Sequence, residues 1–399
     1  MTVSVAQGEK QKIPVTPVLV SVLLFVAVLI AALSIAGSKQ AMAVLLGGLA
    51  GFALYHASFG FTSGWRRIVT EGRGAGLRYQ FLLILLVSAV SFPLIAYGQY
   101  VELPAALFGE GATLRTGGFV APVGVGILAG AFMFGYGMQF GGGCGSGTLY
   151  VAGGGSTRMC ITLAFFIFGS LLGSIHLHWW NALPRFRAWS MVTSLGPLQA
   201  YLVLSAVLFT IGWYTIRRER KLHGEVEQSQ PTGSLLRGPW SPLTGAVVIA
   251  LVSILTLLVL GRPWGITSAF ALWGAKMADL AGFDIYSYPY WSGGRRWSVE
   301  NSVFYNATSV MNFGIMAGAM AAAALAARWR PVFSLRRVEI VTAILGGLLM
   351  GYGARLAYGC NIGAYLGGLI SGSAHGWAWA VSAFAGSSLA VITKKRLGI

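Results

Sequence analysis

The sequence predicts an all-α, polytopic helical membrane protein. Hydrophobic residues make up 56% of the 399 residues and charged residues only 10%, whereas charged residues approach a quarter of an ordinary soluble domain. Apolar stretches of about 18 residues or more, the length that crosses a bilayer as a helix, recur through the chain. The 56 glycines favour the close packing of membrane helices through small residues.

Hydropathy predicts ten membrane spans. They lie near 14–37, 41–60, 80–99, 120–140, 159–177, 197–216, 242–261, 302–327, 339–358 and 376–393. A leader, Met1–Ile13, carries two lysines ahead of the first apolar run. Because that run is longer than the apolar region of a signal peptide, we expect it to be retained as the first helix. Ala41-Met42-Ala43 offers a cleavage site, so removal of the leader stays open as an alternative.

Clusters of basic residues predict the orientation of the spans. They lie at Arg66–Arg78, Arg217–Lys221, Arg328–Arg337 and Lys394–Arg396. Lys and Arg are concentrated in cytoplasmic loops, and an even number of spans separates each cluster from the next. We therefore expect a multi-pass membrane protein with both termini in the cytoplasm. A cytoplasmic linker, 217–241, would join the membrane halves 1–216 and 242–399. The net charge of +17 then reflects mostly this bias and not nucleic acid, and an anionic substrate stays open as a second contributor.

A glycine-rich segment with a single cysteine occurs twice in the chain. Gly141–Gly147 reads Gly-Gly-Gly-Cys-Gly-Ser-Gly, and Gly359–Gly363 reads Gly-Cys-Asn-Ile-Gly. The offset of 216 positions that relates the two cysteines also pairs Gly135-Tyr136-Gly137 with Gly351-Tyr352-Gly353. By the predicted orientation, the first segment follows an inward span and the second an outward span. The sequence thus predicts two inverted five-span repeats, with irregular or re-entrant Gly-rich segments meeting at the centre.

A second pair of motifs follows the second span of each half. These motifs are Gly60–Gly64, with Thr62 and Ser63, and Gly265–Ala269, with Thr267 and Ser268. On the functional interpretation, the four hydroxyl groups lie at the mouths of two half-pores. The alternative is that they cap helices after an irregular break, and the two roles are compatible.

The cysteines of the repeated segments are the main candidate pathway residues. Neutral thiols at Cys144 and Cys360 would be weak donors and soft acceptors, able to hold a sulfur anion briefly without trapping it. Passage through a pore needs such weak binding. The alternative is a small buried apolar residue, which is what we expect of Cys160, outside the repeat. Three scattered cysteines predict neither a disulfide framework nor a zinc site, and we expect no metal or cofactor.

Glycine amides and one arginine are expected to hold the charge of the anion. Gly143, Gly145 and Gly359 let backbone N–H groups point at an anion. Arg355 lies within an apolar run, where an ionisable residue is a functional-site hypothesis; its repeat partner is Gln139. The alternative for Arg355 is a structural pair with a carboxylate.

Four motifs spread over Phe59–His375 carry a family resemblance. They are Phe59-Gly60-Phe61-Thr62-Ser63-Gly64-Trp65-Arg66, Gly143–Tyr150, Gly265–Ser268 and Gly351–Gly363. In these motifs the chain resembles the YeeE/YedE sulphur-transport family, inner-membrane proteins associated with thiosulfate uptake. The resemblance implies an hourglass-shaped helical protein whose cysteines relay thiosulfate inward. It also implies, for some relatives, a small cytoplasmic sulfur-carrier protein as partner.

One position departs from the family pattern. The resemblance implies a third cysteine where this chain has Gly60. Either two thiols suffice here, or the cargo is another sulfur or selenium species. We therefore expect a transporter, not an enzyme, for a small sulfur anion, with thiosulfate first. The alternative from another class is a membrane sulfurtransferase or persulfide carrier that uses Cys144 or Cys360, although no His or Lys adjoins either cysteine to lower its pKa.

Overall fold

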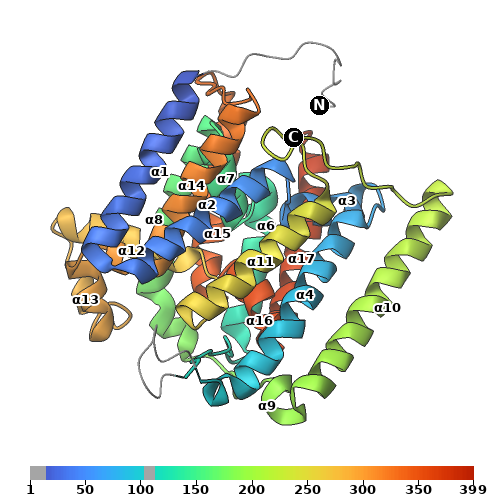
Figure 1. The fold of residues 1–399 in the computed structure, drawn as a ribbon, viewed down its shortest axis with the longest axis horizontal. Coiled ribbons are helices and arrows are strands. Elements are labelled where there is room, and N and C mark those ends of the chain that lie inside the picture. Colours follow the sequence, from blue (N-terminus) through green and yellow to red (C-terminus); the bar gives the residue numbers. More distant parts are fainter. Residues whose placement is uncertain (1–14, 103–112) are drawn as a thin grey trace.

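The computed structural model describes residues 15–102 and 113–399 (Figure 1). Within these ranges the regular elements are all helices, so the all-α prediction is confirmed. The predicted leader Met1–Ile13 lies outside the described residues.

Ten long helices coincide with the ten predicted spans. They are α1 (Val15–Ala36), α2 (Ser38–His56), α4 (Ala75–Tyr97), α6 (Val125–Gly141), α8 (Thr157–Asn181), α10 (Pro197–His223), α11 (Pro242–Leu260), α14 (Ala307–Leu325), α15 (Arg337–Leu356) and α17 (Ala374–Arg396). In the described ranges, nine helices are long and apolar enough to cross a membrane. The helix α6, with 17 residues, is shorter than the others that coincide with spans. The protein is therefore a multi-pass membrane protein.

Four shorter helical segments follow the second and fourth spans of each half. They are α3 (Phe61–Thr70), α7 (Gly145–Gly153), α12 (Thr267–Leu280), and the consecutive η4 (Asn361–Leu366) and α16 (Gly367–Leu369). Our prediction that the Gly-rich segments are irregular was therefore only partly right. The break after α6 is confined to 142–144, and the residues after Cys144 and Cys360 return to helix. Packing in the interior outweighs the helix cost of about 1 kcal/mol for each glycine.

Smaller elements complete the connections between the long helices. They are η1 (Gly98–Tyr100), α9 (Met191–Leu195), η2 (Ile285–Ser287), α13 (Gly294–Glu300) and η3 (Val303–Tyr305). The last three lie between α12 and α14; η2 and α13 pack against α12, whereas η3 packs against α1 and α14. Trp291, which is 3% exposed, donates from Nε1 to Ser174 Oγ on α8 at 2.8 Å.

Helix packing follows a pattern that persists when the two halves are exchanged. The contact of α8 with α15 has its counterpart in that of α17 with α6, and the contact of α2 with α14 has its counterpart in that of α11 with α4. Likewise, α1 packs on α14 and α10 packs on α4. These exchanges support a two-fold repeat. The inversion of the halves across the membrane stays a prediction.

Glycines allow the central helices to cross closely. A Cβ added at Gly135 of α6 would overlap the carbonyl oxygen of Ala383 on α17, and one added at Gly346 of α15 would overlap the backbone of Gly141. Small residues at such crossings let helix backbones approach without a hydrophobic driving force between them. The core of the protein therefore lies around α6, α15 and α17, and the Gly-Cys segments start from two of these three helices.

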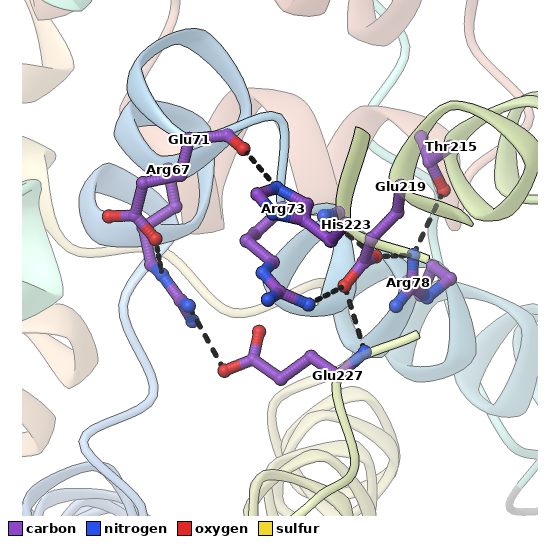
Figure 2. Close-up of polar contacts among 9 residues, drawn as sticks. Arg67, Glu71, Arg73, Arg78, Thr215, Glu219, His223 and Glu227 are labelled. Atoms are coloured by element: carbon purple, nitrogen blue, oxygen red, sulfur yellow. Dashed lines mark hydrogen bonds and ion pairs between the residues drawn. The ribbon is translucent and has the colours of Figure 1, made fainter. Parts of the chain in front are cut away.

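The connector between α10 and α11 is fixed to the protein at its start. Residues 217–223 of the predicted linker continue α10. Glu219 on α10 is fully buried and accepts from Arg73 Nη1 at 3.2 Å and Arg78 Nη1 at 2.8 Å. It also accepts from the amides of Gly74 and Glu227 (Figure 2). The Glu227 carboxylate then pairs with Arg67 on α3 at 3.0 Å.

Candidate functional site

The two Gly-Cys segments meet in the interior of the protein. Cys144 is the N-cap residue of α7 and Cys360 that of η4, and both have extended backbone. The two cysteines are 2% and 0% exposed, respectively. A Cβ added at Gly145 would lie 3.0 Å from Cys360 Sγ. The second thiol is thus in van der Waals contact with the backbone that follows the first.

Backbone geometry explains why glycine flanks both cysteines. Gly142 ends α6 with a left-handed φ of 90°, and Gly359 has a φ of 156°. Tyr358 adopts a φ of 63° just before it, and such a conformation costs a non-glycine residue energy that packing must offset. These turns leave the first amides of each short helix facing the interior, without intrahelical partners. Such amides attract anions.

The Thr-Ser motifs begin the other two short helices. Thr62 and Ser63 lie in the first turn of α3, and Thr267 and Ser268 begin α12. The N-cap residues are Gly60 and Ile266 instead, so the capping alternative was wrong for these hydroxyls. Thr62 is 6% and Thr267 2% exposed.

Gln139 and Arg355, which are partners in the repeat, each bind the threonine of their own half. Gln139 Nε2 donates to the Thr62 carbonyl at 3.1 Å. Arg355 Nη2 donates to Thr267 Oγ1 at 3.1 Å. The two contacts differ in the atom that accepts. Arg355 donates to the hydroxyl oxygen of Thr267, whereas Gln139 donates to the carbonyl of Thr62. The Oγ1 of Thr62 is buried without a hydrogen-bond partner in the described structure.

Two cavities adjoin the two Thr-Ser motifs. The first, which we call the Ser63 cavity, measures about 350 Å³ and is lined by Gly60, Ser63, Arg67 and the connector residues 227–230. The second, which we call the Arg355 cavity, measures about 220 Å³. It is lined by Thr267, Ser268 and Arg355, and by Gly359 and Gly363 on either side of Cys360. Each cavity can hold a small anion with water, since one water takes about 30 Å³ of liquid volume.

Arg355 gives the second cavity its charge. The side chain is 8% exposed and donates from Nη1 to Tyr290 Oη at 3.1 Å, in addition to its bond to Thr267. Its Nε has no partner, and no carboxylate lies within 4.0 Å of it in the described part of the chain. The carboxylate-pair alternative therefore lacks a partner. Arg262 lines the same cavity, which makes the cavity cationic.

Among the predicted site residues, Gly145 lies beside Cys360 and Thr267. Arg355 joins this group through its hydrogen bond to Thr267. Gly143 packs against Gly147, where an added Cβ would lie 3.1 Å from the Gly147 carbonyl carbon. Cys160 is exposed on α8, so the prediction that it is buried was wrong. At Gly60 an added Cβ would lie 2.6 Å from Ser63 Oγ. The Ser63 hydroxyl thus occupies the space that a cysteine at position 60 would need.

Sequence reasoning missed three residues of this site. Tyr290 and Arg262 contribute to the Arg355 cavity, and Asn361 follows Cys360 with its side chain fully buried. A signal existed for Arg262, a charge three residues before Gly265, where the second Thr-Ser motif begins. In the described residues, no group of three His, Cys, Asp or Glu side chains is placed to hold a metal ion.

Comparison with known proteins gives a consistent result. A family model described as sulphur transport matches residues 56–389. The probable transporter YedE of Escherichia coli (strain K12) is 30% identical over 148 residues, which cover 37% of this chain and 36% of that relative. The matched region therefore spans about a third of the length of that relative. The thiosulfate transporter TsuA of the same organism is 25% identical over 80% of this chain and 84% of its own. TsuA of Spirochaeta thermophila is 28% identical over 61% and 70%, respectively.

Proposed function

Because the chain belongs to the sulphur transport family, we propose that it takes up a small sulfur-containing anion, with thiosulfate first, across the bacterial inner membrane. The TsuA relatives, named as thiosulfate transporters, support this cargo. The predicted orientation makes the Arg355 cavity the entrance and the Ser63 cavity the exit, with both termini in the cytoplasm.

The positive charge of the Arg355 cavity favours entry of the anion. Arg355 and Arg262 line the first cavity, and their guanidinium groups attract an anion from water and orient its oxygens. The hydroxyls of Thr267 and Ser268 complete the cavity wall. Since Arg355 is already held by Tyr290 and Thr267, its charge is in position before the anion arrives, which lowers the reorganisation needed for binding.

Weak contacts with uncharged groups let the anion pass between the two cavities. Beyond the Arg355 cavity the anion meets Cys360, then the backbone of Gly145 and Cys144. The thiols and the amides of Gly143, Gly145 and Gly359 would bind it in turn, and none of them carries a charge that would trap it. On the far side, Thr62 and Ser63 lead to the Ser63 cavity, from which a small cytoplasmic sulfur-carrier protein would receive the cargo.

One observation carries the proposal. The two thiols that the repeat pairs are buried where the halves meet, with Cys360 Sγ in contact with the backbone at Gly145. A sulfurtransferase would need a basic group to form the thiolate. Among the described residues, these thiols form one side-chain hydrogen bond, between Cys144 Sγ and Ser146 Oγ at 3.4 Å, and neither bonds to a His or Lys side chain.

The test is uptake of radiolabelled thiosulfate by proteoliposomes that contain the purified protein, with empty liposomes as control. We expect saturable uptake above the control. Competition by unlabelled sulfite, hydrosulfide and selenite would rank other cargoes. Monodisperse protein that takes up no more thiosulfate than empty liposomes would overturn thiosulfate as the cargo, and persulfide found on the purified protein by mass spectrometry would favour a sulfurtransferase.

A further inference from the structure

Asn361 is a buried polar residue without a structural partner. Its side chain is 0% exposed, and neither Oδ1 nor Nδ2 has a hydrogen-bond partner in the described structure. Asn312, also 0% exposed, behaves differently, because its Nδ2 donates to the Ile266 carbonyl at 3.0 Å. Buried amide groups in native proteins are almost always paired. A side chain that leaves both ends unpaired next to a candidate pathway thiol therefore calls for a ligand.

The repeat indicates where the Asn361 side chain points. Its counterpart is Gly145, at the offset of 216 positions. A Cβ added at Gly145 would lie 3.0 Å from Cys360 Sγ and 3.4 Å from Thr267 Cγ2. Exchange of the halves turns Cys360 into Cys144 and Thr267 into Thr62. By this symmetry we expect the Asn361 side chain to lie on the side of Cys144 and Thr62.

The two halves differ in how this space is used. Beside Thr267, Gly145 offers no side chain, and the Oγ1 of Thr267 already accepts a hydrogen bond from Arg355. Beside Thr62, Asn361 offers an amide, and the buried Oγ1 of Thr62 has no hydrogen-bond partner among the described residues. The backbone differs too, since η4 is a π-helix whereas α7 is an α-helix, and π-helical turns occur often at functional sites.

From these observations we infer that Asn361 is a specificity-determining residue, whose amide N–H groups donate to an oxygen of the anion while it lies against Cys144. This inference rests on the proposed function. The thiol meets the sulfur end of the anion, and the amide and the Thr62 hydroxyl meet its oxygens. An amide is a neutral donor, so it selects an oxyanion over hydrosulfide, which has no oxygen, without adding the charge that would hold the anion in place.

The experiment compares Asn361→Ala and Asn361→Asp with the control Asn312→Ala. Thiosulfate uptake by proteoliposomes and the melting temperature in detergent are measured for each. We expect Asn361→Ala to lower kcat/KM for thiosulfate at least tenfold, and Asn361→Asp to lower it further because it exchanges the donor for a negative charge. Asn361→Ala should keep or raise the melting temperature, since it removes an unpaired polar group. Asn312→Ala should lower it.

Competition gives the specificity directly. In the wild type, we expect unlabelled sulfite to inhibit thiosulfate uptake more strongly than hydrosulfide does, and in Asn361→Ala this preference should shrink at least fivefold. This inference alone would be overturned if the wild type transports thiosulfate and Asn361→Ala keeps the wild-type kcat/KM and the wild-type preference for sulfite over hydrosulfide. Loss of uptake that follows a lower melting temperature in Asn361→Ala would also overturn it, because the residue would then be structural. A folded wild type that carries no sulfur oxyanion would overturn the proposed function and this inference with it.

Discussion

Replacement of Arg355 by glutamine, the residue at its repeat partner Gln139, should weaken anion binding without changing the shape of the cavity much. The guanidinium lies 3.1 Å from Thr267 Oγ1, and Thr267 Cγ2 would lie 3.4 Å from a Cβ at Gly145. With the separation of the two atoms within Thr267, the path from the guanidinium to the backbone beside Cys360 is about 9 Å, where one unit charge contributes about 1.8 kcal/mol at an effective dielectric constant of about 20. Since 1.4 kcal/mol is tenfold in affinity, the KM for uptake should rise about 20-fold.

The assay is the concentration dependence of thiosulfate uptake into proteoliposomes, with two further variants. Arg355→Lys keeps the charge but loses the planar fork, so its KM should lie between those of the wild type and Arg355→Gln. Arg187→Gln changes an arginine that is exposed outside the cavity, and its KM should stay within twofold of the wild type. A KM for Arg355→Gln within threefold of the wild-type value would refute the assignment of this charge to the pathway.

Two further substitutions test other parts of the structure. Gly145→Ala places a methyl group 3.0 Å from Cys360 Sγ, so uptake should fall at least fivefold at a stability cost of about 1 kcal/mol. The control Gly126→Ala, whose nearest new contact is at 3.8 Å, should transport as the wild type does. Equal uptake by both variants would contradict the close approach of Gly145 to Cys360. Glu219→Ala leaves Arg73 and Arg78 without their buried carboxylate, so the free energy of unfolding should fall by about 3–5 kcal/mol. A shift in melting temperature in detergent no larger than that of an exposed replacement such as Glu225→Ala would show that this ion cluster does not fix the connector.

The helices were predictable because the membrane restricts what a chain can do. Only helices satisfy the backbone of an apolar span, so hydropathy alone located all ten long helices. The same logic singled out Arg355, since a charge within an apolar run requires a reason. The residues at which helix resumes after Cys144 and Cys360 could not be predicted, because glycine disfavours helix locally and only tertiary packing restores it.

Other features depend on residues far apart in the sequence. Tyr290 binds a guanidinium 65 positions away, and no local pattern announces such a contact. That the Asn361 side chain has no hydrogen-bond partner among the described residues can be seen only in a structure that places every neighbouring group. The helix α10 extends to His223, and Glu219 near its end binds Arg73 and Arg78; hydropathy cannot detect such distant ion pairs.

The most direct test of the account is thiosulfate uptake by Cys144→Ala, Cys360→Ala and Cys160→Ala proteins in proteoliposomes. Cys160 is exposed and provides the matched control. A hydrogen bond to a charged partner contributes about 1.5–3 kcal/mol, so loss of either pathway thiol should lower kcat/KM about 10- to 150-fold, while Cys160→Ala transports as the wild type does. Wild-type uptake rates in both Cys144→Ala and Cys360→Ala would contradict the claim that the anion passes along these thiols.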